Sequence, residues 1–224
     1  MSYSERAFIF DMDGTLVDNM RYHTEAWRTL IEENGFEFNE RTFLVETAGQ
    51  TNREIIPSVF GAMSNDRLHE LALRKEELYR EAYLPHRKPV EGLVEFLEST
   101  RELGIKMAVS TAASPANMAF ILDGLDLRKY FGALTTAADV KRGKPDPEIF
   151  LLSASRLGVR PKDSLVFEDA FFGFEAAKRA GMMAVGITTV NTAEEMMKTG
   201  LVAETHSDYT TMSPDVLIAK YLPL

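Results

Sequence analysis

From Val90 onward, short apolar runs alternate with stretches whose apolar residues recur at helical spacing. The sequence predicts strands at 105–111, 133–136, 164–167 and 183–187, and helices at 91–103, 114–125, 147–157 and 172–180. Strands that alternate with helices are typical of a parallel sheet between two layers of helices. The apolar run 7–10 has the character of a buried strand and is predicted to join this sheet. We therefore expect an α/β fold.

The segment that separates strand 7–10 from Val90 contains helical periodicity and no convincing strand. The helices predicted there are 22–34, 40–47, 52–60 and 66–83. The simplest account is a helical insertion between the first strand and the rest of the sheet. A chain of 224 residues is long enough for one large domain or two modest ones. We expect two: a core of residues 1–17 plus 90–224, and a helical domain of residues 18–89.

Two aspartates end the first predicted strand, since Asp11 and Asp13 follow the run 7–10 and precede Gly14. Residues i and i+2 of a strand point the same way, so both carboxylates would lie at one edge of the sheet. They repel each other unless a cation or a shared proton lies between them. Mg²⁺ is the favoured cation because it prefers oxygen ligands. An ordinary Asp-rich turn is the alternative, whereas a calcium-binding loop is disfavoured because Thr-Leu-Val follows Gly14.

Polar residues follow three other predicted strands, namely Thr111 with Ala112, Lys144, and Glu168 with Asp169. Because the carboxyl ends of parallel strands meet at one edge of the sheet, we expect all of them near the aspartate pair. Each has an ordinary alternative: a helix cap for Thr111, a solvated loop lysine for Lys144, and a capping turn for the acidic pair. Their occurrence together at four strand ends favours a functional site.

The chemistry of this set is that of phosphoryl transfer. A carboxylate can attack phosphorus and form a covalent aspartyl intermediate. Glu168 and Asp169, with Asp11, can hold Mg²⁺, which would screen a phosphate dianion from the attacking carboxylate. The hydroxyl and backbone N–H groups around Thr111 can bind phosphate oxygens, and Lys144 supplies positive charge near the transferring group.

Four strings resemble the motifs of a known family: FIFDMDGTLVD (8–18), VSTAAS (109–114), KRGKPDPEIF (141–150) and FEDAFFGFEAAKRAG (167–181). They resemble those of the haloacid dehalogenase-like (HAD) superfamily phosphotransferases, over nearly the full length of the chain. The segment 18–88 is similar to the small helical cap of the subgroup that contains β-phosphoglucomutase and sugar-phosphate phosphatases. The resemblance implies a Rossmann-like three-layer parallel-sheet core with an inserted cap domain, which acts as a lid and sets specificity.

The resemblance also implies a role for each residue of the set. Asp11 would be the nucleophile, and Asp13 would protonate the leaving group and then activate water. The implied ligands of Mg²⁺ are Asp11, the backbone carbonyl of Asp13, Glu168 and Asp169, and the implied phosphate-binding residues are Gly14, Thr111, Ala112 and Lys144. The carboxylate of Asp13 disfavours the dehalogenase branch, which lacks it.

The choice between a phosphatase and a mutase depends on a second phosphate site. In the β-phosphoglucomutase pattern Ser-Lys-Asn follows the phosphate-binding Ser/Thr-Ala, whereas Ala-Ser-Pro stands here at 113–115. The cap loop of that pattern has a Lys before its Gly, whereas Ala48 precedes Gly49 here, and Arg53 comes one place later than expected. These differences favour a phosphatase that hydrolyses a small phosphate ester such as a sugar phosphate, with the mutase as the alternative.

Substrate choice is expected to depend on the cap loop, formed by Gly49, Gln50, Thr51, Asn52 and Arg53. The alternative for this loop is a polar connection between two helices. His23 matches the mutase histidine that helps to gate the general acid, although a histidine that merely packs near Trp27 would fit the sequence equally well.

The net charge and the lack of cysteine exclude or disfavour several classes of function. The net charge of −9 argues against nucleic acid or an anionic membrane as the main partner. Without cysteine, thiol catalysis, disulfides and thiolate metal sites are excluded. The polar start of the chain lacks a signal-peptide apolar region, and no apolar stretch approaches the roughly 20 residues that cross a bilayer. We expect a soluble cytoplasmic monomer that acts on a small phosphorylated metabolite.

Two other functional classes fit the sequence less well. An NAD-binding enzyme would need a Gly-rich loop after the first strand, where Asp-Met-Asp-Gly stands instead. A non-catalytic binding protein on the same scaffold would be expected to have lost a residue of the chemical set, and none is missing.

Overall fold

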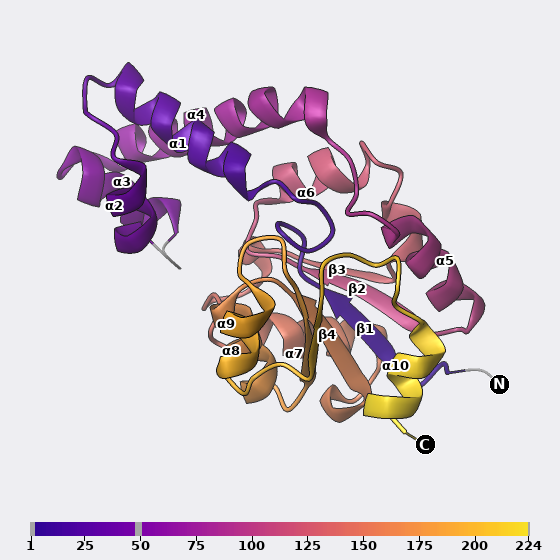
Figure 1. The fold of residues 1–224 in the computed structure, drawn as a ribbon. Coiled ribbons are helices and arrows are strands. Elements are labelled where there is room, and N and C mark those ends of the chain that lie inside the picture. Colours follow the sequence, from indigo (N-terminus) through magenta and orange to yellow (C-terminus); the bar gives the residue numbers. More distant parts are fainter. Residues whose placement is uncertain (1–2, 48–50, 224) are drawn as a thin grey trace. The chain divides into compact units, whose positions relative to one another are not determined.

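The computed structural model describes residues 3–47 and 51–223 and contains a six-stranded sheet in the order β3-β2-β1-β4-β5-β6 (Figure 1). The strands are β1 (Ala7–Phe10), β2 (Lys106–Ser110), β3 (Ala133–Thr135), β4 (Ser164–Glu168), β5 (Met183–Ile187) and β6 (Glu204–His206). Neighbouring strands are parallel throughout. This confirms the α/β prediction and the place of the first apolar run in the sheet.

The chain divides into two compact units, the described parts of Met1–Asp18 with Lys88–Leu224, and Asn19–Arg87. The first unit holds the sheet. Its helices are α5 (Leu93–Glu102), α6 (Pro115–Leu122), α7 (Glu148–Leu157), α8 (Phe171–Arg179), α9 (Ala193–Lys198) and α10 (Pro214–Tyr221), with short 3-10 segments η2 (Arg128–Tyr130), η3 (Ala137–Asp139) and η4 (Pro161–Asp163). Helices therefore cover the sheet, as a Rossmann-like three-layer core requires.

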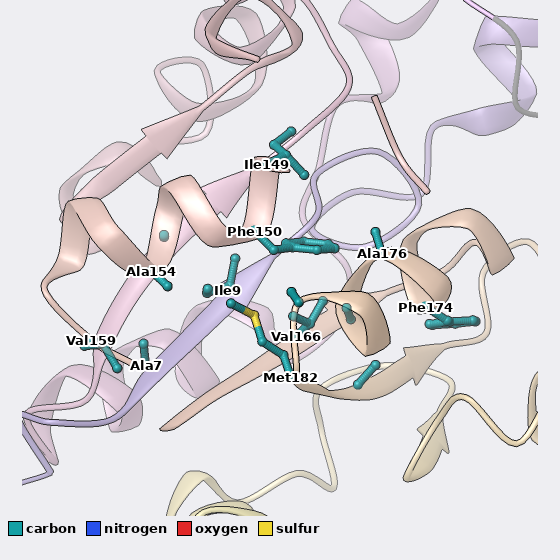
Figure 2. Close-up of a cluster of buried hydrophobic side chains, with 14 of the residues drawn as sticks. Ala7, Ile9, Ile149, Phe150, Ala154, Val159, Val166, Phe174, Ala176 and Met182 are labelled. Atoms are coloured by element: carbon teal, nitrogen blue, oxygen red, sulfur yellow. The ribbon is translucent and has the colours of Figure 1, made fainter. Parts of the chain in front are cut away.

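One face of the sheet packs against α7 and α8 through a mostly aliphatic cluster that includes two phenylalanines (Figure 2). Ile9 of β1 and Val166 of β4 lie there among residues such as Phe150 of α7 and Phe174 of α8. Burial of each such side chain stabilises the fold by about 1.5–3 kcal/mol. The packing of α7 and α8 on this face thus stabilises the strands that precede Asp11 and Glu168.

The opposite face is aromatic. Phe10 of β1 stacks on Phe167 of β4 with ring centroids 4.6 Å apart. Phe96 of α5 and Tyr209, in the segment that precedes α10, lie on the same cluster with their centroids 5.2 Å apart. Because both faces are covered, β1 has the uninterrupted apolar sequence of a central strand.

Within its described residues the second unit contains helices joined by short loops and no strand. The helices are α1 (Met20–Glu33), α2 (Glu40–Thr47), α3 (Asn52–Phe60), α4 (Asn65–Tyr83) and the 3-10 segment η1 (Leu84–His86). Helix α1 packs along α4, with Trp27 and Leu30 buried on one and Leu71 and Tyr79 on the other. The prediction that this segment contains helices and no strand is confirmed for the residues that the structure describes.

The two points at which the sheet unit is interrupted by the helical unit lie side by side. The backbone N–H of Val90 donates to the carbonyl of Leu16 over 2.9 Å, and both residues belong to the sheet unit. The long insertion therefore leaves the sheet and returns to it at one place.

Some elements differ from the sequence prediction. Strand 105–111 is shorter as β2, and helix 114–125 ends at Leu122 and is followed by a turn in which Asp126 has a φ of 55°. No element was predicted after residue 187, where α9, β6 and α10 lie. Strand β6 has only three residues, all half-buried, which is too short for an alternating pattern. Among the described residues, no helix has the length and apolar character needed to cross a membrane.

Candidate active site

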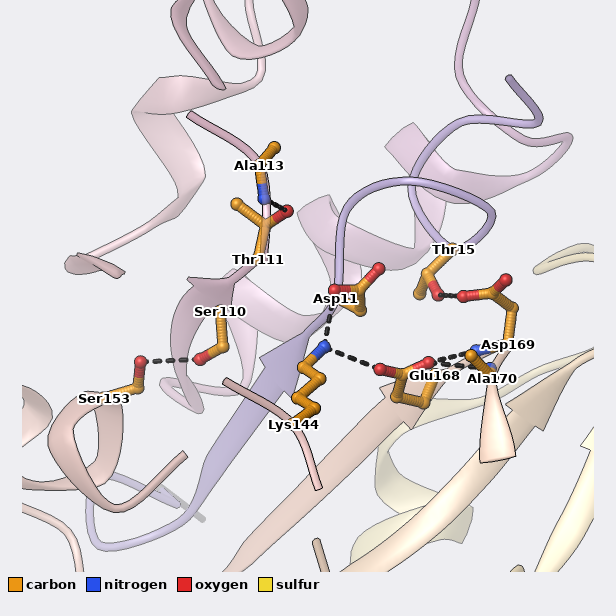
Figure 3. Close-up of polar contacts among 10 residues, drawn as sticks. All are labelled: Asp11, Thr15, Ser110, Thr111, Ala113, Lys144, Ser153, Glu168, Asp169 and Ala170. Atoms are coloured by element: carbon orange, nitrogen blue, oxygen red, sulfur yellow. Dashed lines mark hydrogen bonds and ion pairs between the residues drawn. The ribbon is translucent and has the colours of Figure 1, made fainter. Parts of the chain in front are cut away.

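An ion-paired triad lies at the carboxyl edge of the sheet (Figure 3). Lys144 Nζ is 2.6 Å from Asp11 Oδ1 and 2.6 Å from Glu168 Oε1. All three side chains are buried, with 9%, 10% and 2% of their surfaces exposed, respectively. Asp11 and Glu168 lie 133 and 24 positions from Lys144 in the sequence, and the fold brings all three together at this edge.

The ends of β1 and β4 place the two carboxylates of this triad. Asp11 directly follows β1, and its backbone N–H donates to the carbonyl oxygen of Phe167 of β4 over 2.9 Å. Glu168 ends β4, and its Oε2 accepts the N–H groups of Asp169 and Ala170 at 2.7 and 2.8 Å. With Oε1 on Lys144, both oxygens of Glu168 are held in place.

Asp169 lies against the turn that follows Asp11. Thr15 Oγ1 donates to Asp169 Oδ1 over 3.3 Å. Gly14 has a φ of 79°, and a Cβ there would lie 2.3 Å from Asp169 Oδ2. Only glycine fits this position, because any side chain would be strained and would collide with the carboxylate.

Asp11, Glu168 and Asp169 offer carboxylate oxygens that lie within 4.8 Å of one another. Burial, together with the charges of Glu168 and Asp13 and against the attraction of Lys144, raises the pKa of Asp11 from 3.8 to about 7. Burial and the charges of Glu168 and Asp11 also raise the pKa of Asp169 well above its ordinary value. Lys144 alone therefore does not balance the negative charge of the cluster.

The electrostatics of Lys144 differ from those of an exposed lysine. Burial by itself would lower its pKa, but Asp11 and Glu168 outweigh this effect and raise the pKa above its usual value. Lys144 is therefore a permanent cation of the site. A donor set of oxygens with uncompensated charge fits a hard divalent cation such as Mg²⁺.

The other predicted core residues lie close to their strand ends. Thr111 follows β2, is buried, and pairs with Thr135 through its backbone N–H. Its hydroxyl accepts the N–H of Ala113 over 3.0 Å, while Ala112 is exposed. Asp13 is half-buried and forms a backbone bridge with Val17.

Comparison with known proteins shows the family. The model of the haloacid dehalogenase-like hydrolases matches residues 5–181. The chain belongs to the haloacid dehalogenase-like hydrolase family. It is therefore an enzyme of a family that contains phosphatases and phosphomutases, as the sequence motifs predicted.

Three relatives of this hydrolase illustrate the range of the family. It is 37% identical to the fructose-1-phosphate phosphatase YqaB of Escherichia coli strain K12 over 80% of this chain and 94% of the relative. It is 33% identical to the beta-phosphoglucomutase of Bacillus subtilis strain 168 over 92% of each chain. A solved beta-phosphoglucomutase from Clostridium difficile superposes with a TM-score of 0.83 at 27% identity, covering 97% of each chain.

The predicted cap residues of the hydrolase are only partly described. Gly49 and Gln50 lie outside the described residues. Thr51 caps α3 by exchanging hydrogen bonds with Glu54, and Arg53 is exposed. Asn52 Nδ2 donates to Glu76 Oε1 over 2.7 Å within the helical unit. Thr51 and Asn52 thus have structural partners besides any role in binding.

His23 belongs to a polar cluster that the sequence prediction missed in part. Its ring stacks on Tyr79 with centroids 3.8 Å apart, and its Nδ1 lies 2.8 Å from Lys75 Nζ. Lys75, which is only 4% exposed, also pairs with Glu76 over 3.0 Å. A signal for Lys75 was present, because it lies four residues after Leu71 on the apolar stripe of its helix.

Gly173 of α8 is a second residue that the motif analysis left without a role. A Cβ at Gly173 would lie 1.8 Å from Glu168 Oε1, which is held by Lys144. We expect Gly173→Ala to displace the carboxylate, reduce activity about 10- to 100-fold and destabilise the fold by about 1–3 kcal/mol. Steady-state kinetics and thermal unfolding measure the two effects.

Gly143→Ala is the matched control, because a Cβ at Gly143 meets no atom within 4 Å. It should keep wild-type activity although it neighbours Lys144. Equal activity of the Gly173→Ala variant and the wild type would contradict the close packing of Glu168 on α8.

Proposed function

We propose that this hydrolase is a Mg²⁺-dependent phosphatase that cleaves a small phosphate ester, such as a sugar phosphate, through an aspartyl-phosphate intermediate. The observation that carries the proposal is the buried cluster of Asp11, Glu168 and Asp169 around Lys144 at the edge of the sheet. Three carboxylates and one ammonium in a buried site combine a nucleophile, a cation-binding set and a fixed positive charge.

Asp11, Glu168 and Asp169, with the backbone carbonyl of Asp13, would hold the cation. When bound, Mg²⁺ would supply charge compensation that allows a phosphate dianion to approach a carboxylate. Thr15 and Lys144 fix the orientation of Asp169 and Glu168, so the oxygen ligands are preorganised by the protein. Lys144 and the N–H groups around Thr111 would bind the phosphate oxygens.

The proposed reaction has two steps. A carboxylate oxygen of Asp11 attacks phosphorus, the bond from phosphorus to the ester oxygen breaks, and Asp13 donates a proton to the departing alcohol. Asp13 then accepts a proton from a water molecule that attacks the phosphorus. The bond between phosphorus and Asp11 breaks, inorganic phosphate leaves, and Asp11 returns to its carboxylate form.

The helical unit Asn19–Arg87 is proposed to act as the lid and to select the substrate. A mutase must also hold the distal phosphate of a bisphosphate intermediate, which requires cationic donors. The segment after Thr111 supplies Ala113 and Ser114, and Ser114 is occupied as the N-cap of α6. This supports hydrolysis over transfer to a second hydroxyl.

A panel of phosphate esters with Mg²⁺ tests the proposal. The panel should contain fructose 1-phosphate, β-glucose 1-phosphate, glucose 6-phosphate and p-nitrophenyl phosphate, with phosphate release as the measurement. We expect release from at least one sugar phosphate that depends on Mg²⁺. Interconversion of the two glucose phosphates without net phosphate release would establish the mutase instead, and no turnover of any ester would contradict the proposal.

Arg53 tests the role of the cap loop. It is exposed at the first turn of α3, so its guanidinium is accessible to an anionic substrate. We expect Arg53→Ala to raise the KM of the best sugar phosphate about 5- to 50-fold with a smaller change in kcat, as loss of one charged hydrogen bond would do.

Arg41→Ala is the control for this variant, because Arg41 is an exposed arginine of α2 in the same unit. It should leave KM unchanged. An unchanged KM in both variants would remove Arg53 from the specificity residues without affecting the proposed chemistry at Asp11.

A further inference from the structure

Three side chains from the C-terminal part of the sheet unit bond to the turn and strand end that carry the acidic cluster. They are Thr189 and Asn191, in the loop after β5, and Tyr209, in the segment after β6. We call them the C-terminal support. All three lie beyond residue 181, where the match to the family model ends, and none belongs to the motifs of the sequence analysis.

Two members of the C-terminal support come from one loop and bond to two different elements. Thr189 Oγ1 donates to the carbonyl oxygen of Gly14, in the turn after Asp11. Asn191 Nδ2 donates over 2.9 Å to the carbonyl oxygen of Asp169, at the end of β4. The loop therefore joins two backbone segments that have no covalent link near the site.

Tyr209 approaches the same turn from the aromatic face of the sheet. It is 2% exposed, and its ring packs on Phe96 and Phe167 while its hydroxyl donates to the carbonyl of Thr15 over 3.3 Å. Thr15 in turn donates its own hydroxyl to Asp169 over 3.3 Å. Tyr209 is thus linked through Thr15 to the carboxylate of Asp169.

The close approach of Gly14 to Asp169 explains why such a support is needed. The two residues are so near that a Cβ on Gly14 would lie 2.3 Å from Asp169 Oδ2. A small movement of the turn or of the strand end would therefore change the distance between Asp11 and Asp169. Ligand sets for Mg²⁺ tolerate little deviation from octahedral geometry.

We propose that Thr189, Asn191 and Tyr209 are positioning residues that hold the Gly14–Thr15 turn against Asp169 and so keep the carboxylates at the spacing that Mg²⁺ requires. The inference rests on the proposed function only in naming Mg²⁺ as the ion. Their hydrogen bonds go to the backbone carbonyls of Gly14, Asp169 and Thr15, so they act on the acidic cluster through these residues.

The first test measures binding of Mg²⁺ alone by titration calorimetry. We expect Asn191→Ala to weaken binding about 10-fold or more, and Tyr209→Phe and Thr189→Val to weaken it about 3- to 10-fold each, since each loses one hydrogen bond. Thr189→Ser keeps the hydroxyl that Thr189→Val loses, and it should therefore retain the wild-type affinity for Mg²⁺. Turnover of the Asn191→Ala variant should recover at high Mg²⁺, whereas KM for the ester should change little.

The second test uses hydrogen exchange without Mg²⁺. Amides of residues 12–18 and 168–173 should exchange faster in Asn191→Ala and Tyr209→Phe than in the wild type. Tyr130→Phe is the matched control, because it removes a buried tyrosine hydroxyl that bonds Glu98 of α5 instead of the site. It should change neither the exchange of these segments nor the affinity for Mg²⁺.

The outcomes separate the two proposals. Unchanged exchange in the support variants overturns the inference, and so does faster exchange with an affinity for Mg²⁺ that stays within twofold of the wild type. A wild-type protein that binds no Mg²⁺ overturns the proposed metal dependence, whereas the exchange experiment still decides whether the C-terminal support holds the turn.

Discussion

Asp11→Asn is expected to reduce turnover of the best phosphate ester by at least about 10⁴-fold, because an amide cannot form the aspartyl phosphate. The fold should be retained. Asp11 is buried with a pKa raised to about 7, so its ionised form is costly to bury and a neutral amide of the same shape is well tolerated. The kcat and the midpoint of thermal unfolding measure the two effects.

Asp123→Asn provides the comparison, because it makes the same chemical change at an exposed aspartate that pairs with Arg128 on the surface. It should retain wild-type kcat. Activity within tenfold of the wild type in Asp11→Asn would show that another group attacks phosphorus. A large fall in the unfolding midpoint of Asp11→Asn would show that Lys144 needs both of its carboxylate partners for stability.

Removal of Mg²⁺ is the second change with a large expected effect. Chelation with EDTA should lower phosphatase activity to the background of the assay, and re-addition of Mg²⁺ should restore it. Mg²⁺ at about 100 times its Kd should stabilise the folded state by about 2.7 kcal/mol. In a chain of this length that corresponds to a rise in the unfolding midpoint of roughly 5–10 °C at pH 8.

The stabilisation by Mg²⁺ should depend on pH in a defined direction. Without a cation, folded Asp11 keeps its proton up to about pH 7, whereas unfolded Asp loses it near 3.8. Between these values the folded state binds more protons, so the contribution of Asp11 to the free energy of unfolding falls as pH rises and is lost above about pH 7. On the proposed function, Mg²⁺ would bind the ionised carboxylate and offset this loss.

Thermal unfolding at pH 5 and pH 8, with Mg²⁺ or EDTA, measures this dependence. We expect less than about half of the pH 8 shift at pH 5, because a proton must first leave Asp11. Ca²⁺, which prefers longer bonds and more ligands, is a useful comparison ion. An equal shift at both pH values would contradict the raised pKa of Asp11.

The parts of the site that the sequence predicted lie at the end of a strand or, for Lys144, in the loop that follows one. Strand β5 was predicted with its observed bounds, and the strand before Asp11 was recognised because an apolar run buried on both faces has no polar interruption. Parallel pairing then places the residues after each strand at one edge. Local patterns were therefore sufficient to bring Lys144 and Glu168 to Asp11.

The C-terminal support could not be predicted in this way. Its residues lie in irregular segments around a three-residue strand. Their partners are backbone carbonyls 22 to 194 positions away, and such contacts leave no pattern in the local sequence. Lys75 was missed for a different reason. Its helix was predicted, but the sequence does not show that this lysine, on an apolar stripe, contacts His23 of another helix.

The hydrogen bond between Val90 and Leu16 has a consequence for the history and engineering of this chain. Because the insertion starts and ends at adjacent points, its length and sequence can change without altering the path of the sheet strands. If the inserted unit selects the substrate, as proposed, substrate range and bond-breaking chemistry can evolve separately, one by replacement of the insertion and the other by changes at the edge of the sheet. Grafting the inserted segment of a relative between these two points should transfer substrate preference while Asp11 and Lys144 keep their positions.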